Sequence, residues 1–248
     1  MLEFKKVNAF YHKKQVIFNA NFNINKGVTC VLGKNGSGKT TLFSLVLNQI
    51  KYTGDIIFNN KSLKELSITK RAKMVSFLPQ SLNDTALTVK ELVMLARSPY
   101  LNFNNPQKED YNAVDFAIKT VELNEKENQK VCNLSGGEKQ RAYLALMLAK
   151  NTDLYIFDEP LSFLDPKFTS LFLSVVKQLK EQEKTVVIIM HDVNKALEIA
   201  DEILLLDDGK IKFLGQKAEA INAKIIEKTF NLKKYEIIEN NEKEFIFK

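Results

Sequence analysis

The chain has 248 residues, of which 45% are apolar and 27% are charged, and its formal net charge is +6. These values are typical of an ordinary globular protein with enough apolar material for a sizeable core. The lysines are spread along the chain rather than gathered on one arm, so we favour a solvated basic surface and expect no nucleic-acid partner.

No stretch of the sequence is long enough to cross a membrane as a helix. The longest apolar runs, Thr185–Met190 and Glu202–Leu206, fall far below the roughly 20 residues that a spanning helix needs. The first residues lack the apolar segment of a secretory signal, so we expect a cytoplasmic protein. The two cysteines, Cys30 and Cys132, are far apart in apolar surroundings, and we expect buried free thiols rather than a disulfide or metal pair.

Short apolar runs alternate with helical patterns along the chain. The run Val28–Leu32 ends in a glycine-rich loop and a predicted helix, Leu154–Phe157 ends in two acids, and Thr185–Met190 ends in His-Asp. Continuous apolar runs that end in polar residues are typical of buried parallel strands whose carboxyl ends build a site. The stretch 202–215 predicts a hairpin with its turn at Asp207–Lys210.

The pattern between Gln80 and Asn151 is helical. Thr88 and Glu91 form a capping box, and residues 108–123 predict a second helix. A helical insertion of about 70 residues therefore interrupts an α/β core. A later helix carries an apolar stripe that we interpret as core packing, and residues 218–230 predict one last helical piece. The stripe consists of Phe168, Leu171, Phe172, Val175, Val176 and Leu179.

The stretch GKNGSGKTT follows a predicted strand and precedes a predicted helix. It fits the phosphate-binding P-loop pattern G-x-x-x-x-G-K-[ST], and this context argues against a merely flexible turn. The glycines let the backbone wrap around phosphate oxygens. Lys39 can reach the β- and γ-phosphates, and the Thr40 hydroxyl can ligate Mg²⁺. The nucleotide-binding residues expected here are Gly33, Lys34, Asn35, Gly36, Ser37, Gly38, Lys39, Thr40 and Thr41.

Two acids, Asp158 and Glu159, follow the strand predicted at Leu154–Phe157. Asp158 is placed to hold Mg²⁺ through water. Glu159 is next along the strand and points a different way, so it can orient or deprotonate an attacking water. Taken alone, such a pair is most often just a strand end. Together with the P-loop, the two acids form the second half of an ATPase site.

The stretch LSGGEKQR, residues 134–141, places two glycines at a predicted helix start. Ser135 and Glu138 form a capping box, which explains those two residues as a well-capped helix. It leaves Gly136 and Gly137 unexplained, because glycine is costly inside a helix. The simplest account is that the glycines let a phosphate approach the helix start. A second phosphate site far from the P-loop indicates a composite site.

This stretch resembles the signature motif of ATP-binding-cassette (ABC) ATPases, and the family's motifs occur in order over nearly the whole chain. The resemblance implies an α/β fold: a P-loop NTPase (RecA-like) core with an antiparallel β subdomain and a helical signature subdomain. We assign the single domain 1–248 as a nucleotide-binding core (1–80 and 151–215), a helical subdomain (81–150) and a C-terminal extension (216–248). The family packs two copies head to tail, so that Ser135, Gly136, Gly137 and Glu138 serve the partner's ATP.

The resemblance assigns four further residues, each of which has a plainer alternative. Gln80 resembles the glutamine that contacts Mg²⁺ or water and links the core to the helical part; alone, it is a polar residue in a turn. Asp165 resembles an aspartate at the dimer seam; alone, it is an N-cap before Pro166. His191 resembles the histidine that contacts the γ-phosphate, and a lone histidine is more often structural. Tyr11 resembles the aromatic that stacks on adenine, but Phe10 and Tyr11 could equally be strand core.

Local similarity narrows the choice within the family. VMLARSPYLNF, residues 93–103, and residues 215–237 resemble ATPases of the iron-siderophore, haem and cobalamin import group. They imply an ATPase, with ATP and Mg²⁺, that powers import of an iron complex or related metal chelate. A second copy, two integral-membrane permease subunits and, indirectly, a substrate-binding protein would be its partners, at the cytoplasmic face of the membrane. The alternative is a soluble ABC ATPase, such as the iron–sulfur cluster assembly type.

Overall fold

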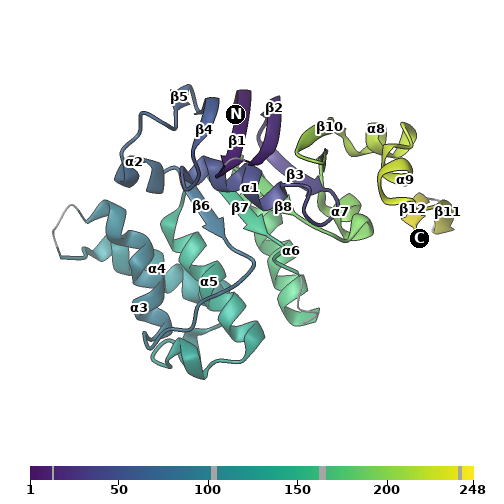
Figure 1. Cartoon of the computed structure of the whole chain (residues 1–248). Coiled ribbons are helices and arrows are strands. Elements are labelled where there is room, and N and C mark those ends of the chain that lie inside the picture. Colours follow the sequence, from purple (N-terminus) through teal and green to yellow (C-terminus); the bar gives the residue numbers. More distant parts are fainter. Residues whose placement is uncertain (13, 102–104, 162–165, 240–241) are drawn as a thin grey trace. The chain divides into compact units, whose positions relative to one another are not determined.

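The computed structural model describes residues 1–12, 14–101, 105–161, 166–239 and 242–248 (Figure 1). The chain divides into two compact units. Unit 1 consists of residues 1–65 and 185–248, and unit 2 of residues 66–184. Among the described residues, no helix combines the length and apolar character that crossing a bilayer requires.

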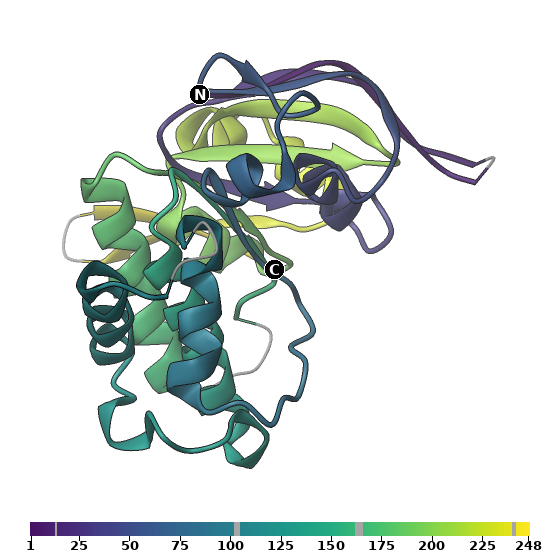
Figure 2. The same cartoon turned by 90° about the vertical axis from the view of Figure 1, so that its left-hand side faces the viewer.

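Unit 1 begins with an antiparallel sheet of four strands in the order β2-β1-β4-β5. Apolar side chains alternate along β1 and are buried, and the Phe4 ring stacks on Phe22 with centroids 4.5 Å apart. Figure 2 shows the β1–β2 hairpin extending past the other strands of its sheet. The strands are β1 (Leu2–Tyr11), β2 (Lys14–Ile24), β4 (Tyr52–Phe58) and β5 (Lys61–Ser62).

The second part of unit 1 is a set of mostly parallel strands. β3 (Gly27–Leu32) lies between β8 (Thr185–Ile189) and β9 (Glu202–Asp207) and is parallel to both. β10 (Lys210–Gln216) returns antiparallel to β9, which confirms the predicted hairpin. All β8 residues are buried, as expected for continuous apolar runs. The helices here are α1 (Lys39–Ser44), the 3₁₀ turn η1 (Leu45–Leu47) and α7 (Val193–Ile199).

The last part of unit 1 differs from the prediction of one helical piece. Two short helices form instead, α8 (Lys217–Asn222) and α9 (Ile225–Phe230), because Lys224 between them adopts a left-handed φ of 52°. A hairpin that was not predicted follows, made of β11 (Lys234–Glu239) and β12 (Glu242–Phe247). The Asn194 side chain of α7 hydrogen-bonds both the backbone N–H and the carbonyl of Phe247, at 2.9 and 3.1 Å.

Unit 2 combines two parallel strands with helices. β6 (Val75–Leu78) pairs with β7 (Leu154–Asp158), and α5 packs against α3 and α4 (Figure 1). The capping box of Thr88 and Glu91 is confirmed at the start of α3. The other elements are α2 (Ile68–Ala72), α3 (Val89–Met94), η2 (Leu95–Tyr100), α4 (Lys108–Thr120), η3 (Asn124–Lys126), η4 (Val131–Asn133), α5 (Gly136–Lys150) and α6 (Pro166–Glu181).

The burial of the α6 side chains and of the two cysteines only partly follows the predictions. The α6 stripe is buried as predicted, except that Leu171 is only half-buried. The prediction that both cysteines are buried is wrong for Cys132, which is exposed, whereas Cys30 is buried. Cys132 lies in the short turn η4, where its neighbours Val131 and Leu134 face inward and leave the thiol outside.

Candidate functional site

The loop between β3 and α1 is shaped by its glycines. Gly36 and Gly38 have φ values of 76° and 100°, which L side chains avoid, and Gly38 caps α1. A Cβ on Gly33 would lie 2.2 Å from the Leu206 carbonyl oxygen, so only glycine fits there. The loop therefore turns tightly without side chains, as the backbone of a phosphate cradle must.

Lys39 lies across this loop rather than in solvent. Lys39 is 5% exposed, and its Nζ donates to the carbonyl oxygens of Gly33 (2.8 Å) and Lys34 (3.1 Å). Two backbone carbonyls of the loop thus help to hold the ammonium group at the loop. A polyanion bound in the loop would be a stronger partner for that charge than the two carbonyls, because hydrogen bonds between ionised groups are the stronger ones.

The β9–β10 turn supports the same loop. The Gly209 N–H donates to the Ser37 carbonyl, and the Gly209 carbonyl accepts from the Phe18 N–H, both at 2.9 Å. Gly209 has a φ of 70°, and a Cβ on it would lie 2.1 Å from the Val16 carbonyl oxygen. One glycine thus ties the loop to β2. The Asp-Gly turn was predicted, but nothing in it indicated this contact with Ser37.

Tyr11 and His191 are the other predicted site residues of unit 1. Tyr11 is 48% exposed and pairs with Lys14 across the β1–β2 hairpin, and Phe10 is exposed as well. The alternative that these two aromatics are strand core is therefore wrong. His191 is exposed two residues after β8 ends at Ile189. It precedes Asp192, whose side chain caps α7 by accepting from the Lys195 N–H at 3.1 Å.

In unit 2 the two acids have different environments. Asp158 is the last residue of β7 and is 2% exposed. Glu159 leaves the strand with a φ of 52°, an uncommon conformation for a glutamate that turns the chain sharply away from β7. The Gln80 side-chain amide donates to Glu159 Oε2 at 2.6 Å. The structure thus brings Gln80 and Glu159 together from the ends of two adjacent strands.

The signature stretch forms the start of α5. The Ser135 N–H donates to Glu138 Oε2 at 2.9 Å, and Ser135 Oγ accepts from the Glu138 N–H at 3.4 Å, which confirms the predicted capping box. Lys126 pairs with Glu138, and its side chain, with the Ser135 N–H, lowers the pKa of Glu138 to about 2. The Glu138 carboxylate therefore stays charged and the helix start stays capped at neutral pH.

Gly136 is not required by packing within the chain. A Cβ built on it meets nothing within 4 Å among the described residues. Within the described part of the chain, an external group could therefore approach Gly136 where a side chain would otherwise stand. Asp165 lies outside the described residues.

Comparison with known proteins decides the family. The family model described as ABC transporter matches residues 17–162. The chain belongs to the ABC transporter family. The petrobactin import ATP-binding protein FpuC of Bacillus anthracis is 33% identical over 99% of this chain and 92% of that protein.

Solved structures agree with this membership. A chain from an inward-facing structure assigned to a metal-chelate type ABC transporter has a TM-score of 0.80 and 26% identity over 99% of this chain and 96% of that one. A dimeric bacterial ABC transporter cassette has a TM-score of 0.76 and 27% identity over 88% of this chain and 99% of that one. The predicted P-loop NTPase fold class is confirmed, and this ABC protein is an ATP-binding, ATP-hydrolysing subunit.

Proposed function

We propose that this chain powers import of an iron complex of the siderophore class, or a related metal chelate, across the cell membrane. The observation that carries the proposal is the similarity to FpuC, a petrobactin import ATP-binding protein. This similarity spans 99% of the chain. The metal-chelate type transporter among the solved structures supports the same class of cargo. The predicted alternative, a soluble assembly ATPase, is not favoured, because these relatives belong to transporters.

The P-loop and Lys39 bind the nucleotide phosphates in this proposal. Residues 33–41 wrap the phosphates with backbone N–H groups, and Lys39 exchanges the carbonyls of Gly33 and Lys34 for phosphate oxygens. Tyr11, exposed at the hairpin tip, stacks on the adenine base. His191 contacts the γ-phosphate from the turn between β8 and α7.

The donor set fits Mg²⁺, because this ion is usually held by one or two protein oxygens, phosphates and water. Thr40, Asp158 and Gln80 would hold the ion, which when bound neutralises phosphate charge. Asp158, 2% exposed at a strand end, is the fixed carboxylate of this set.

Glu159 is the proposed base. Its carboxylate accepts a proton from, or orients, the water that attacks the γ-phosphate. In the structure this carboxylate accepts from Gln80, so both residues act at one place. Ser135, Gly136, Gly137 and Glu138 face the ATP of a second copy. The open space in front of Gly136 supports this arrangement.

The proposed assembly has two copies of this chain under two permease subunits at the cytoplasmic face of the membrane, supplied by a substrate-binding protein. Residues 81–150 relay motion from the nucleotide-binding core (1–80 and 151–215) to the permease. Pull-down of the tagged chain from solubilised membranes tests this assembly. Recovery of a polytopic permease is expected, and recovery of soluble partners alone, with ATPase activity intact, would overturn the importer proposal.

The role of Glu159 is tested by Glu159→Gln. The variant should bind ATP but lose nearly all turnover, and ATP should trap it as a dimer, because closure no longer ends in hydrolysis. Glu183→Gln is the matched control: Glu183 also has a positive φ, 55°, and is exposed between α6 and β8, away from the motifs. It should turn over at the wild-type rate. Wild-type turnover by Glu159→Gln would remove Glu159 from the mechanism.

A further inference from the structure

The segment that follows Gln80 is fastened to the signature helix. Residues 81–87 run from β6 to α3 alongside α5 (Figure 1). The Tyr143 hydroxyl of α5 donates to the Asn83 carbonyl at 2.7 Å, and Lys139 of α5 pairs with the Asp84 carboxylate. All of these residues belong to unit 2.

Backbone contacts extend the attachment beyond α5. The N–H groups of Cys132 and Val131, which precede the signature stretch, donate to the carbonyls of Thr85 and Leu87 at 3.1 and 2.9 Å. At its other end the segment begins at Gln80, which donates to Glu159. A continuous chain of contacts therefore runs from Glu159 through Gln80 and residues 83–87 to the start of α5.

Lys139 and Tyr143 are four residues apart, so their side chains leave the same face of the first turns of α5. The two bonds are not equal. The Asp84 side chain is 70% exposed, and an ion pair in water adds little. Tyr143 is half-buried, and burial raises the pKa of its hydroxyl. Of these two side-chain bonds to α5, the one from Tyr143 to the Asn83 carbonyl is therefore the stronger.

We propose that Tyr143, assisted by Lys139, is a positioning residue for ATP hydrolysis. It makes the first turns of the signature helix move with the segment after Gln80. The position of Gln80 relative to Glu159 then determines the orientation of Ser135, Gly136 and Gly137 toward the partner's nucleotide. The proposal rests on the proposed function, because it assumes that the signature helix serves ATP in a second copy.

Tyr143→Phe tests this role by removing only the hydroxyl. ATP binding by the monomer should not change, because the P-loop is untouched. The kcat for ATP should fall about three- to tenfold, the range expected for losing one hydrogen bond made in the active arrangement. ATP-induced dimerisation in the Glu159→Gln background should weaken by a similar factor. Lys139→Met should have a smaller effect on kcat than Tyr143→Phe.

Tyr100→Phe is the matched control. The Tyr100 hydroxyl donates at 2.8 Å to the Lys150 carbonyl, at the opposite end of the same helix. If the Tyr143 hydroxyl had a merely structural role, Tyr143→Phe and Tyr100→Phe would behave alike. Both would have lower thermal stability, and their kcat values would equal each other. We expect Tyr100→Phe to keep the wild-type kcat. A wild-type kcat in Tyr143→Phe, or an equal fall in both variants, would overturn the inference.

Failure of this inference can be told apart from failure of the proposed function. If Glu159→Gln abolishes turnover and ATP dimerises it, the proposed function stands, and an unaltered Tyr143→Phe removes only the coupling role. If Glu159→Gln hydrolyses ATP normally, the proposed function itself is wrong.

Discussion

The buried ion pair between η2 and α4 gives a stability prediction that the structure makes quantitative. Arg97 Nε lies 2.8 Å from Asp110 Oδ1, and the two side chains are only 13% and 9% exposed. A second guanidinium nitrogen donates to the Ala149 carbonyl at 3.0 Å. Arg97→Met would leave a buried carboxylate and a buried carbonyl each short of a donor. We expect the free energy of unfolding to fall by about 3 kcal/mol.

Urea unfolding followed by circular dichroism measures this loss as a fall in midpoint at unchanged m-value. The double variant Arg97→Met/Asp110→Asn should recover part of it, because the unpaired buried charge is gone. Lys184→Met is the control: its partner Asp153 is 60% exposed, so the loss should be below about 1 kcal/mol. A loss below about 1 kcal/mol for Arg97→Met, or no recovery in the double variant, would refute the reasoning.

Two further predictions concern the helix start and the phosphate loop. The folded protein lowers the pKa of Glu138, so the charged carboxylate stabilises the fold fully above the ordinary glutamate pKa. This stabilisation is lost as the pH falls from about 5 towards 2. Glu138→Gln should therefore flatten the dependence of the urea midpoint on pH in that range. Gly209→Ala should weaken ATP binding about tenfold or more in a fluorescent-nucleotide titration, because its Cβ would displace the turn that holds Ser37. Gly54→Ala, with φ 80° and a Cβ 2.4 Å from the Lys5 carbonyl oxygen, should lower stability but keep nucleotide affinity; equal affinity loss in both would contradict the role of Gly209.

Local signals made much of the fold predictable. The apolar run before GKNGSGKTT predicted β3 and α1, and the capping boxes at Thr88 and Ser135 predicted two helix starts, because each signal involves residues close in sequence. The break at Lys224 had no such signal: neither glycine nor proline occurs in residues 217–230. The hairpin β11–β12 was missed because its short apolar runs are weak strand signals.

The candidate site was predictable in its residue types and not in its contacts. Motif spacing indicated Lys39, Asp158 and Glu159, although their roles stay predictions. The contacts of Gly209 with Ser37 and of Tyr143 with Asn83 join residues far apart in the sequence, and only the folded chain brings them together. The exposure of Cys132 was missed for a related reason, since apolar neighbours in sequence do not decide which side of a short turn faces solvent.

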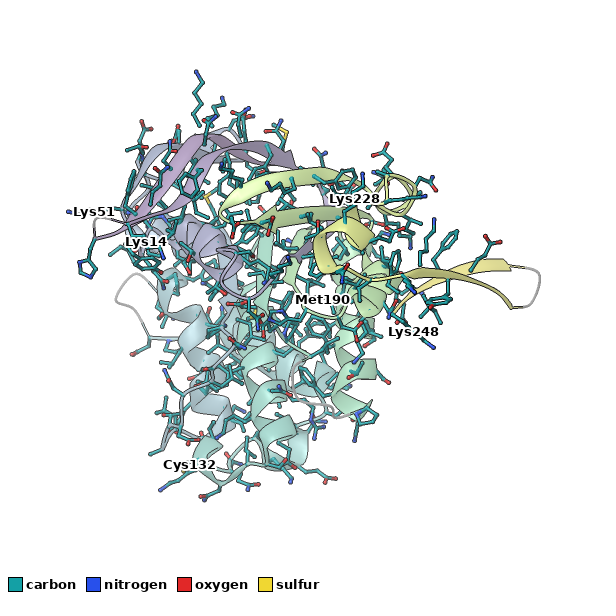
Figure 3. The ribbon with its side chains drawn as sticks, turned by 45° about the vertical axis from the view of Figure 1, so that its right-hand side comes forward. Lys14, Lys51, Cys132, Met190, Lys228 and Lys248 are labelled. Carbon is teal, nitrogen blue, oxygen red and sulfur yellow. The ribbon has the colours of Figure 1, made fainter. Side chains whose placement is uncertain are left out.

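Because one cysteine is buried and the other is exposed, a thiol reagent should modify this protein at a single position. Cys30 is fully buried, and burial raises its pKa to about 12, so its thiol is inert to alkylation. Cys132 is exposed and lies at the lower end of the unit 2 helices in Figure 3, three residues before Ser135. A maleimide dye would therefore attach at one position, beside the signature helix. The natural sequence already offers a single-site fluorescent reporter of whatever approaches that helix.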